Sequence, residues 1–249
     1  LGDEHDRATA GHVVVRADSV MLDSNRGQSV AGRRHRFGPA SFAVRAGEVI
    51  GIAAIDGNGQ RELLRAIAGV DGVEVAGGQL AVDGPVAFVP EDRSSEGLIP
   101  SFTLTQNLLL GTLGEAPQWL DWNALHVRTR TLIAERDIRA AGTEAEAASL
   151  SGGNQQKFIL ARALAGRPRV IVAEDPTRGL DLQATAAIHR ELREAARAGA
   201  AVIVHASDLD EVLELSDRIL VVAGGALCEL PAGTSRAAVG DAMLGLPST

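Results

Sequence analysis

Three short apolar runs, each rich in β-branched residues, constrain the fold of this chain more than any other feature. They are RVIVAE at residues 169–174, AAVIVHAS at 200–207 and RILVVAGG at 218–225, and helix-like stretches separate them. Strands buried on both faces of a parallel sheet have this nearly continuous apolar character, and helices connect them. The pattern therefore predicts an α/β fold with a parallel sheet at its core.

The N-terminal third of the chain adds further strands. HVVVRA, from residue 12, predicts one strand, and the segment that follows to residue 55 predicts more, with a turn at Gly38 and Pro39. Residues 79–92, QLAVDGPVAFVPED, predict two strands joined by a turn at Asp83 and Gly84. Residues 61–68 carry apolar side chains at helical spacing and predict a helix.

Between residues 94 and 149 the pattern becomes helical, for example in LTQNLLLGTL from residue 104 and NALHVRTRTLIAERDIRAA from residue 123. Strand and helix alternation resumes after it. The order of these patterns predicts a helical lobe inserted between two halves of one α/β core.

Composition excludes several classes of protein. The net charge of −8 argues against a nucleic-acid-binding surface, which is usually basic. A single cysteine, Cys228, excludes an internal disulfide framework. No apolar run approaches the ~20 residues that a membrane-spanning helix needs. Because the chain begins with Leu1 and not with methionine, we expect a fragment of a longer protein.

The stretch AAIDGNGQRELL, residues 53–64, is typical of a phosphate-binding loop whose charged residues have been replaced. Such loops have the pattern G-x-x-x-x-G-K-S/T and join a buried strand to a helix. Here Ala54 replaces the first glycine, Gln60 the lysine, and Arg61 the hydroxyl residue that binds magnesium. The stretch by itself leaves open a nucleotide site, an inactivated one or an ordinary turn.

A second glycine-rich turn, LSGGNQQKFILARAL at residues 150–164, precedes a well-patterned helix. We expect Ser151 to cap this helix, and the two glycines after it to leave backbone N–H groups bare. The N-terminus of a helix carries roughly half a positive charge, which favours a phosphate. A simple capped helix is the alternative.

The order of residues in this motif is more specific than the general affinity of a helix N-terminus for phosphate. L-S-G-G-x-Q closely resembles the signature motif of ABC ATPases. VIVAEDPTRGLD, from residue 170, resembles the Walker B strand and D-loop of that family. AFVPEDR, from residue 87, and VIVHASDLDEV, from residue 202, occupy the places of the Q-loop and the switch-histidine segment. GNGQREL, VPEDR, LSGGNQQK and PTRGLD together resemble the second, degenerate ATPase half of tandem-ATPase importers for simple sugars and nucleosides.

The resemblance implies a P-loop NTPase fold, with a RecA-like parallel-sheet core, an N-terminal antiparallel β subdomain and an inserted helical subdomain. It covers about residues 45–225 and implies one ABC ATPase domain over residues 1–249. The predicted core comprises residues 12–93 and 159–230, the helical subdomain residues 94–158, and the C-terminal tail residues 231–249.

The chain's own ATP site departs from the family pattern. Its implied phosphate-loop residues are Asp56, Gly57, Asn58, Gly59, Gln60, Arg61 and Glu62. Glu174 falls at the metal-supporting aspartate position and is the one possible ligand for nucleotide-bound Mg²⁺; Asp175 falls where a glutamate polarises the attacking water. Glu91 replaces the Q-loop glutamine and Ser207 the switch histidine. These changes predict a weakened site for Mg-ATP.

Two other residues near this site have less specific interpretations. His205 lies two positions before Ser207, and we interpret it as a packed strand residue. Phe37 is the nearest aromatic candidate for stacking on adenine.

The signature, in contrast, is intact. In the family it completes the ATP site of a partner half in a head-to-tail dimer. The resemblance assigns this role to Ser151, Gly152, Gly153 and Gln155, with Asp181 of the D-loop at the same interface. The implied partner is a second ATPase half with an intact phosphate loop, on the same native chain, so we expect weak self-association of this chain alone.

The first hypothesis is therefore one half of an ATP-driven importer, located peripherally at the cytoplasmic face of the membrane. Residues 92–110 and the helical lobe would dock on a membrane permease, and an extracytoplasmic solute-binding protein would take part indirectly. A catalytically silent regulatory or assembly module is the alternative. An ABC ATPase of DNA repair or chromosome maintenance is disfavoured, because the sequence shows neither long coiled coils nor a basic surface.

Overall fold

The main sheet of the computed structural model has six strands and is parallel except at one edge. The model describes residues 11–23, 36–111, 119–231 and 233–246. The strand order is β5 (Val86–Val89), β6 (Val170–Glu174), β7 (Ala201–His205), β3 (Val49–Ala54), β8 (Arg218–Ala223) and β9 (Ala226–Leu230). β9 alone runs antiparallel to its neighbour. The predicted parallel core is confirmed, and the three apolar runs form β6, β7 and β8.

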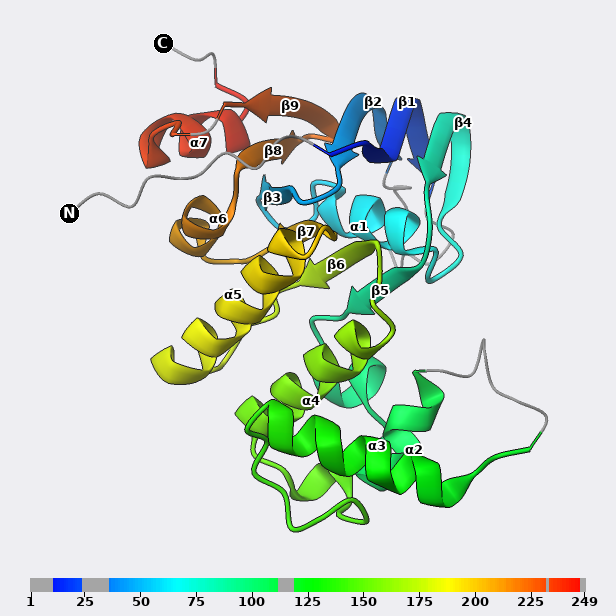
Figure 1. Ribbon diagram of the computed structural model, residues 1–249. Coiled ribbons are helices and arrows are strands. Elements are labelled where there is room, and N and C mark those ends of the chain that lie inside the picture. Colours follow the sequence, from blue (N-terminus) through cyan, green and yellow to red (C-terminus); the bar gives the residue numbers. More distant parts are fainter. Residues whose placement is uncertain (1–10, 24–35, 112–118, 232, 247–249) are drawn as a thin grey trace.

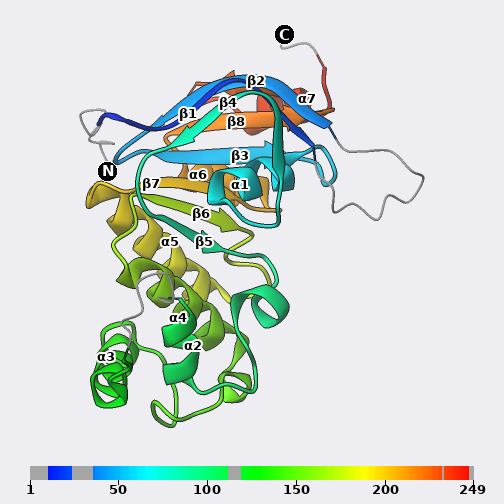
Figure 2. The same cartoon turned by 90° about the vertical axis from the view of Figure 1, so that its right-hand side faces the viewer.

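A second, three-stranded antiparallel sheet covers one face of the main sheet. Its order is β2 (Arg36–Arg45), β1 (Val13–Asp23) and β4 (Glu74–Val82). Helix α1 (Gln60–Ala68) lies between the two sheets, as Figure 2 shows. Its Leu63, Leu64 and Ile67 are buried there in one hydrophobic cluster with residues of both sheets. The antiparallel subdomain is therefore confirmed, and α1 connects the subdomain to the core.

Helices α4 (Gly152–Ala165) and α5 (Leu182–Arg197) pack on the opposite face of the main sheet. The remaining helices before α4 lie between β5 and β6 in sequence and form the lobe at the lower end of Figure 1. They are η1 (Arg93–Gly97), α2 (Leu104–Leu110), α3 (Trp122–Glu135) and η3 (Ala147–Ser149). Near the C-terminus, α6 (Leu209–Leu215) and α7 (Arg236–Met243) pack beside β3 and β8.

The helical insertion is thus where the sequence pattern predicted it. The finer division of the chain into core, insertion and tail stays a prediction, and its boundary at residue 158 falls within α4. No helix in the described ranges is both long and apolar enough to cross a membrane.

The turn predicted at Gly38 and Pro39 is wrong, since both residues lie inside β2. Gly38 has φ +100°, and its N–H donates to the carbonyl of Gly225 in the β8–β9 turn at 2.8 Å. A glycine can take this backbone conformation at little cost, so the strand is interrupted without reversing direction. The turn at Asp83 and Gly84 exists, but the strands that it joins, β4 and β5, belong to different sheets.

Candidate functional site

The carboxyl ends of three neighbouring strands bring most of the predicted site residues to one edge of the main sheet. β6 pairs with β7, and β7 with β3, all in parallel, so that Glu174, His205 and Ile52 lie side by side. The glycine-rich loop follows β3, Glu174 ends β6 with Asp175 directly after it, and Ser207 follows β7. This edge is where open α/β sheets bind their ligands.

The loop between β3 and α1 has the backbone of a tight turn into a helix. Gly57 has φ +85° and Gly59 has φ +105°, and Gly59 is the N-cap of α1. A side chain at Gly59 would start 3.2 Å from the Phe37 ring, which packs underneath the loop. Phe37 is 1% exposed, so the interpretation of its ring as an adenine-stacking platform is wrong.

Gln60, at the position of the lysine, turns back into the loop. Its side-chain oxygen accepts a hydrogen bond from the N–H of Asn58 at 3.1 Å, and its amide nitrogen lies 3.4 Å from a carboxylate oxygen of Asp56. The N–H of Asn58 also points to the carbonyl of Ile55, at 3.3 Å. The loop therefore uses one of its own donors internally, and the buried Gln60 offers no positive charge to a phosphate.

Glu174, at the metal-supporting position, is held by Arg65 from α1 in a two-pronged ion pair. Nε of Arg65 lies 3.0 Å from one carboxylate oxygen of Glu174, and Nη2 lies 2.9 Å from the other. Both side chains are 5% exposed. Burial raises the pKa of Glu174, and the hydrogen bonds and positive charge of Arg65 oppose this rise. Such fork-to-fork pairs combine strength with a defined geometry.

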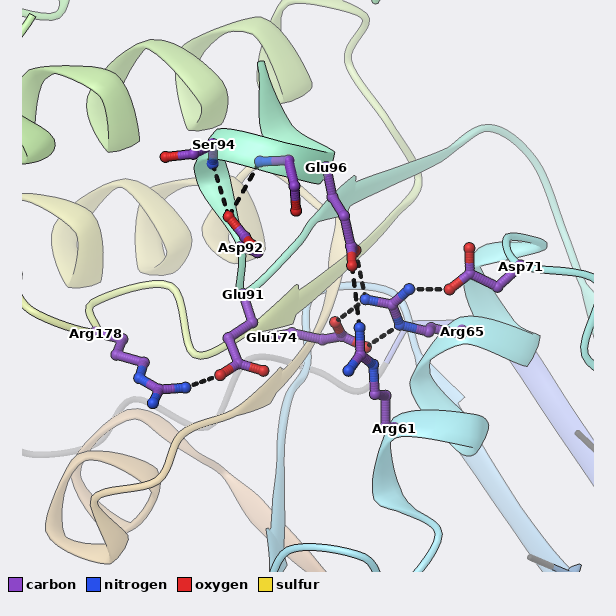
Figure 3. A network of polar contacts seen from close by, with 10 residues as sticks. Arg61, Arg65, Asp71, Glu91, Asp92, Ser94, Glu96, Glu174 and Arg178 are labelled. Carbon is purple, nitrogen blue, oxygen red and sulfur yellow. Dashed lines mark hydrogen bonds and ion pairs between the residues drawn. The ribbon is translucent and has the colours of Figure 1, made fainter. Parts of the chain in front are cut away.

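The network around Arg65 includes two more acids and one more arginine (Figure 3). Arg65 contacts Asp71, and its Nη2 lies 2.5 Å from Glu96 of η1. Glu96 also pairs with Arg61, at 3.0 Å. The Arg65 guanidinium in addition lies 5.4 Å from the centre of the Phe88 ring, within cation–π range. Arg65 is therefore fixed from several sides.

The residues at the magnesium positions do not fit a divalent cation. Both oxygens of Glu174 already accept hydrogen bonds from a guanidinium, and Glu91 of the Q-loop position pairs with Arg178. Gln60 and Arg61 supply no hydroxyl oxygen. Within the part of the chain that the structure describes, no group of three or more His, Cys, Asp and Glu side chains could hold a metal.

Asp175 and Ser207, which the resemblance assigned to the water-polarising and switch positions, lie side by side in the structure. Asp175 has φ +41°, and its carboxylate accepts a hydrogen bond from the N–H of Ser207 at 2.5 Å. Ser207 is exposed. His205 is 5% exposed, and its Nδ1 lies 2.9 Å from the carbonyl of Ile52. The interpretation of His205 as a packed strand residue is confirmed.

At the signature, Ser151 occupies the N-cap position of α4, but its side chain accepts no hydrogen bond from the helix N–H groups. The expected capping by its hydroxyl is therefore wrong, because that oxygen instead accepts from the side chain of Asn154 at 2.8 Å. Gln155 donates to the carbonyl of Ala147 at 3.0 Å, which ties the helix to η3. The first turn of α4 thus stays uncapped by a side chain.

A cavity of about 340 Å³ adjoins this turn, and Ser151, Gly153 and Asp181 all line it. Its other walls come from the end of α3, from α4 and from α5. Asp181 accepts a hydrogen bond from the N–H of Ala184 at 2.8 Å and so caps α5. Among the described residues that line the cavity, none belongs to the phosphate loop. The structure therefore places the two glycine-rich turns in separate sites.

Sequence reasoning missed two arginines. Arg65 lies outside the apolar face that the buried leucines and isoleucine form on α1, so the sequence contained no signal of its burial, and only a buried charge demands a partner. Arg93 was missed as well: its guanidinium lies 3.0 Å from the position of a Cβ on Gly152, and it donates to the carbonyl of Arg178 at 3.2 Å. Nothing in the local sequence around Arg93 predicts that approach.

Comparison with known proteins identifies the family of this chain. The family model of the ABC transporter matches residues 37–178, which is more than half of the chain. The nucleoside import ATP-binding protein NupA of Lactococcus lactis is 40% identical over 82% of the chain and 44% of its own length. The xylose import ATP-binding protein XylG of Burkholderia ambifaria is 39% identical over 87% of the chain and 44% of its own length.

Solved structures agree on the fold. An ATP-binding cassette in a dimeric post-hydrolysis state, bound to ADP and Pi, superposes with a TM-score of 0.74 at 21% identity, covering 89% of this chain and all of that one. An ATP-binding subunit of an ABC transporter gives a TM-score of 0.73 at 18% identity, over 92% and 99% of the two chains.

The fold and the motif order define an ABC-type ATP-binding domain. The chain belongs to the ABC transporter family, and its curated relatives include ATP-binding proteins of sugar and nucleoside import. It spans less than half the length of these relatives.

Proposed function

We propose that this chain is one ATP-binding half of an ABC importer for simple sugars or nucleosides, with a degenerate ATP site of its own. The names of its relatives support the class of transported solute. That it spans about 44% of their length supports a second half beside it in the native protein. The single observation that carries the degenerate site is the Arg65–Glu174 pair, which occupies the metal-supporting carboxylate.

In this proposal the chain's own loop, residues 56–62, binds ATP weakly and does not hydrolyse it. Glu174, paired with Arg65, offers no free metal-supporting carboxylate beside Asp175. Ser207 has no imidazole with which to act as the switch histidine. The uncapped turn at Ser151, Gly152 and Gly153 contacts the γ-phosphate in the partner's site instead, with Asp181 at the same interface. Mg²⁺ would act there, in the partner's site, with the nucleotide.

The helical lobe docks on a membrane permease, which keeps the domain peripheral at the cytoplasmic face, and an extracytoplasmic solute-binding protein delivers the solute. Ile99 and Phe102, between η1 and α2, are 38% and 37% exposed and lie in the segment that we assign to this contact. The division into core, helical insertion and tail belongs to the same proposal.

Steady-state Mg-ATP hydrolysis by this chain alone is the first test, with Asp175→Asn as the matched control. We expect no turnover above that control. Robust turnover that Asp175→Asn abolishes would contradict the proposal, because the chain would then be an active ATPase in its own right.

The alternative is a silent regulatory or assembly module. The internal bonding of the phosphate loop, with Gln60 bonded to Asn58 and Arg65 paired with Glu174, supports it. A second test distinguishes it from the importer half. The chain is combined with an ATPase half that has an intact phosphate loop, and turnover is measured with and without this chain. If the signature of this chain completes the partner's ATP site, adding the chain stimulates ATP turnover by the partner half. A silent module that binds the same partner leaves turnover unchanged.

A further inference from the structure

We propose that Arg65 takes the place of the divalent cation at this phosphate loop, so that the loop binds a nucleoside triphosphate without Mg²⁺. This inference rests on the proposed function in one respect, namely that the loop binds nucleotide at all. It goes further because it assigns the chemical form of the ligand and the residue that determines it.

The first argument is the occupancy of the carboxylate. One guanidinium bonds both oxygens of Glu174, at 3.0 and 2.9 Å, so that each oxygen already accepts a charge-assisted hydrogen bond. Mg²⁺ requires close to octahedral oxygen coordination at roughly 2.0–2.1 Å and gives up its water reluctantly. A cation that used Glu174 would have to share these oxygens with Arg65 and would meet the positive charge of its guanidinium.

The second argument is that Arg65 is held where it is. Its side chain is 5% exposed, and it contacts Asp71 and Glu96 in addition to Glu174. The ring of Phe88 lies beneath the guanidinium. Removing one partner of a buried ion pair leaves an uncompensated charge, which is strongly unfavourable. A cation that displaced Arg65 would have to overcome that cost.

The third argument is the charge balance. Glu174, Glu96, Asp71 and Glu91 contribute four negative charges, and Arg65, Arg61 and Arg178 contribute three positive ones, all in the ion pairs that Figure 3 shows. The cluster as a whole therefore carries one net negative charge. Every one of the four carboxylates has an arginine partner, so a dication that approached any of them would also meet a positive charge.

The charged group left for the ligand is Arg61, at the start of α1. It is 54% exposed and makes one ion pair, with Glu96. Its charge adds to the positive end of the helix, which favours phosphate oxygens. The loop therefore offers a cationic side chain and backbone N–H groups to a triphosphate, with no role for a metal ion between them.

The test is a titration of a fluorescent ATP analogue with the wild-type chain, followed by anisotropy, once in excess Mg²⁺ and once in excess EDTA. We expect the two dissociation constants to agree within about threefold. A larger loss of affinity on chelation would overturn the inference and would leave the proposed degenerate ATP site standing. Absence of binding in both conditions would overturn nucleotide binding at this loop and the inference with it.

A variant tests the residue itself. Arg65→Gln frees both oxygens of Glu174, so we expect the variant to gain a preference for Mg²⁺ in the same titration. Arg162→Gln is the matched control, because Arg162 is another largely buried arginine, whose guanidinium donates to the carbonyls of Gly97 and Asn107. A folded Arg65→Gln chain that remains indifferent to Mg²⁺ would overturn the assignment. Should the variant fail to fold, the wild-type titration still decides.

Discussion

The two glycine-rich turns of this chain have similar local sequences, but the side chains around them differ. Each leads into a helix, α1 after Gly59 and α4 after Ser151. At the first turn, nearby polar groups are bonded to one another: the Gln60 side chain accepts a hydrogen bond from the loop, and Arg65 pairs with Glu174. At the second, Ser151 does not cap the helix, and a cavity adjoins it.

The difference shows that a glycine-rich turn does not by itself define a competent phosphate site. What decides is which charges approach it from elsewhere in the fold. At the first turn the acids of two other segments, η1 and β6, are neutralised by arginines on α1. At the second turn the side chain that approaches Gly152 is Arg93, which brings a positive charge.

The largest expected effect comes from removing the ion pair beside the first turn, the phosphate loop. Arg65→Ala leaves Glu174 as a buried carboxylate without its partner, so we expect a loss of about 3–5 kcal/mol in the free energy of unfolding. Urea denaturation measures it. Arg61→Ala is the control, because Arg61 is 54% exposed and an exposed pair contributes less than about 1 kcal/mol. Equal losses in the two variants would show that Arg65 is not structurally central.

The next effect tests the second turn, the signature turn at Ser151, Gly152 and Gly153. A Cβ on Gly153 would lie 3.5 Å from Ala184, which is an ordinary contact, so Gly153→Ala should fold normally. In a complex with an intact ATPase half, we expect its turnover to fall on the order of 100-fold, or about 2.7 kcal/mol, because the methyl group obstructs phosphate contact. Gly57→Ala should leave that turnover unchanged. Undiminished turnover with Gly153→Ala would contradict the proposed role of the signature.

A smaller effect separates packing from backbone strain within the phosphate loop. Gly57→Ala adds a side chain at φ +85° with nothing within 4 Å, so we expect a loss of about 1–2 kcal/mol from the backbone alone. Gly59→Ala has φ +105° and in addition approaches Phe37 at 3.2 Å, so its loss should be larger. Denaturant unfolding of the two variants compares them. A smaller loss at Gly59 would mean that Phe37 moves aside freely.

The smallest effect concerns pH. Burial raises the pKa of Glu174 above its ordinary value of 4.5, so the folded chain retains a proton that the unfolded chain has already lost. Stability from this residue is therefore highest below pH 4.5 and falls as the pH rises through the raised pKa. The urea concentration at the midpoint of unfolding, measured from below pH 4.5 to neutral pH, should fall less steeply with rising pH in Glu174→Gln than in the wild-type chain. An identical pH profile in the variant would assign the slope to other groups.

Sequence alone determined the architecture and the motif order. The apolar runs at residues 169–174, 200–207 and 218–225 predicted buried parallel strands, since such strands carry apolar side chains on both faces. The helical pattern between residues 94 and 149 predicted the insertion. The sequence also identified the substitutions at Gln60 and Arg61, because they occur within a phosphate-loop motif of defined spacing.

Only the tertiary structure decided how those substitutions are accommodated. Arg65 and Glu174 are 109 positions apart, and their pairing depends on α1 lying over the carboxyl end of β6. The burial of Phe37 and the approach of Arg93 to Gly152 likewise depend on contacts between distant segments. Local patterns report which face of an element is apolar. Which charge meets which partner is determined when the elements pack, because the electrostatic attraction of a pair depends on the distance between the two charges in space and not on their separation in the sequence.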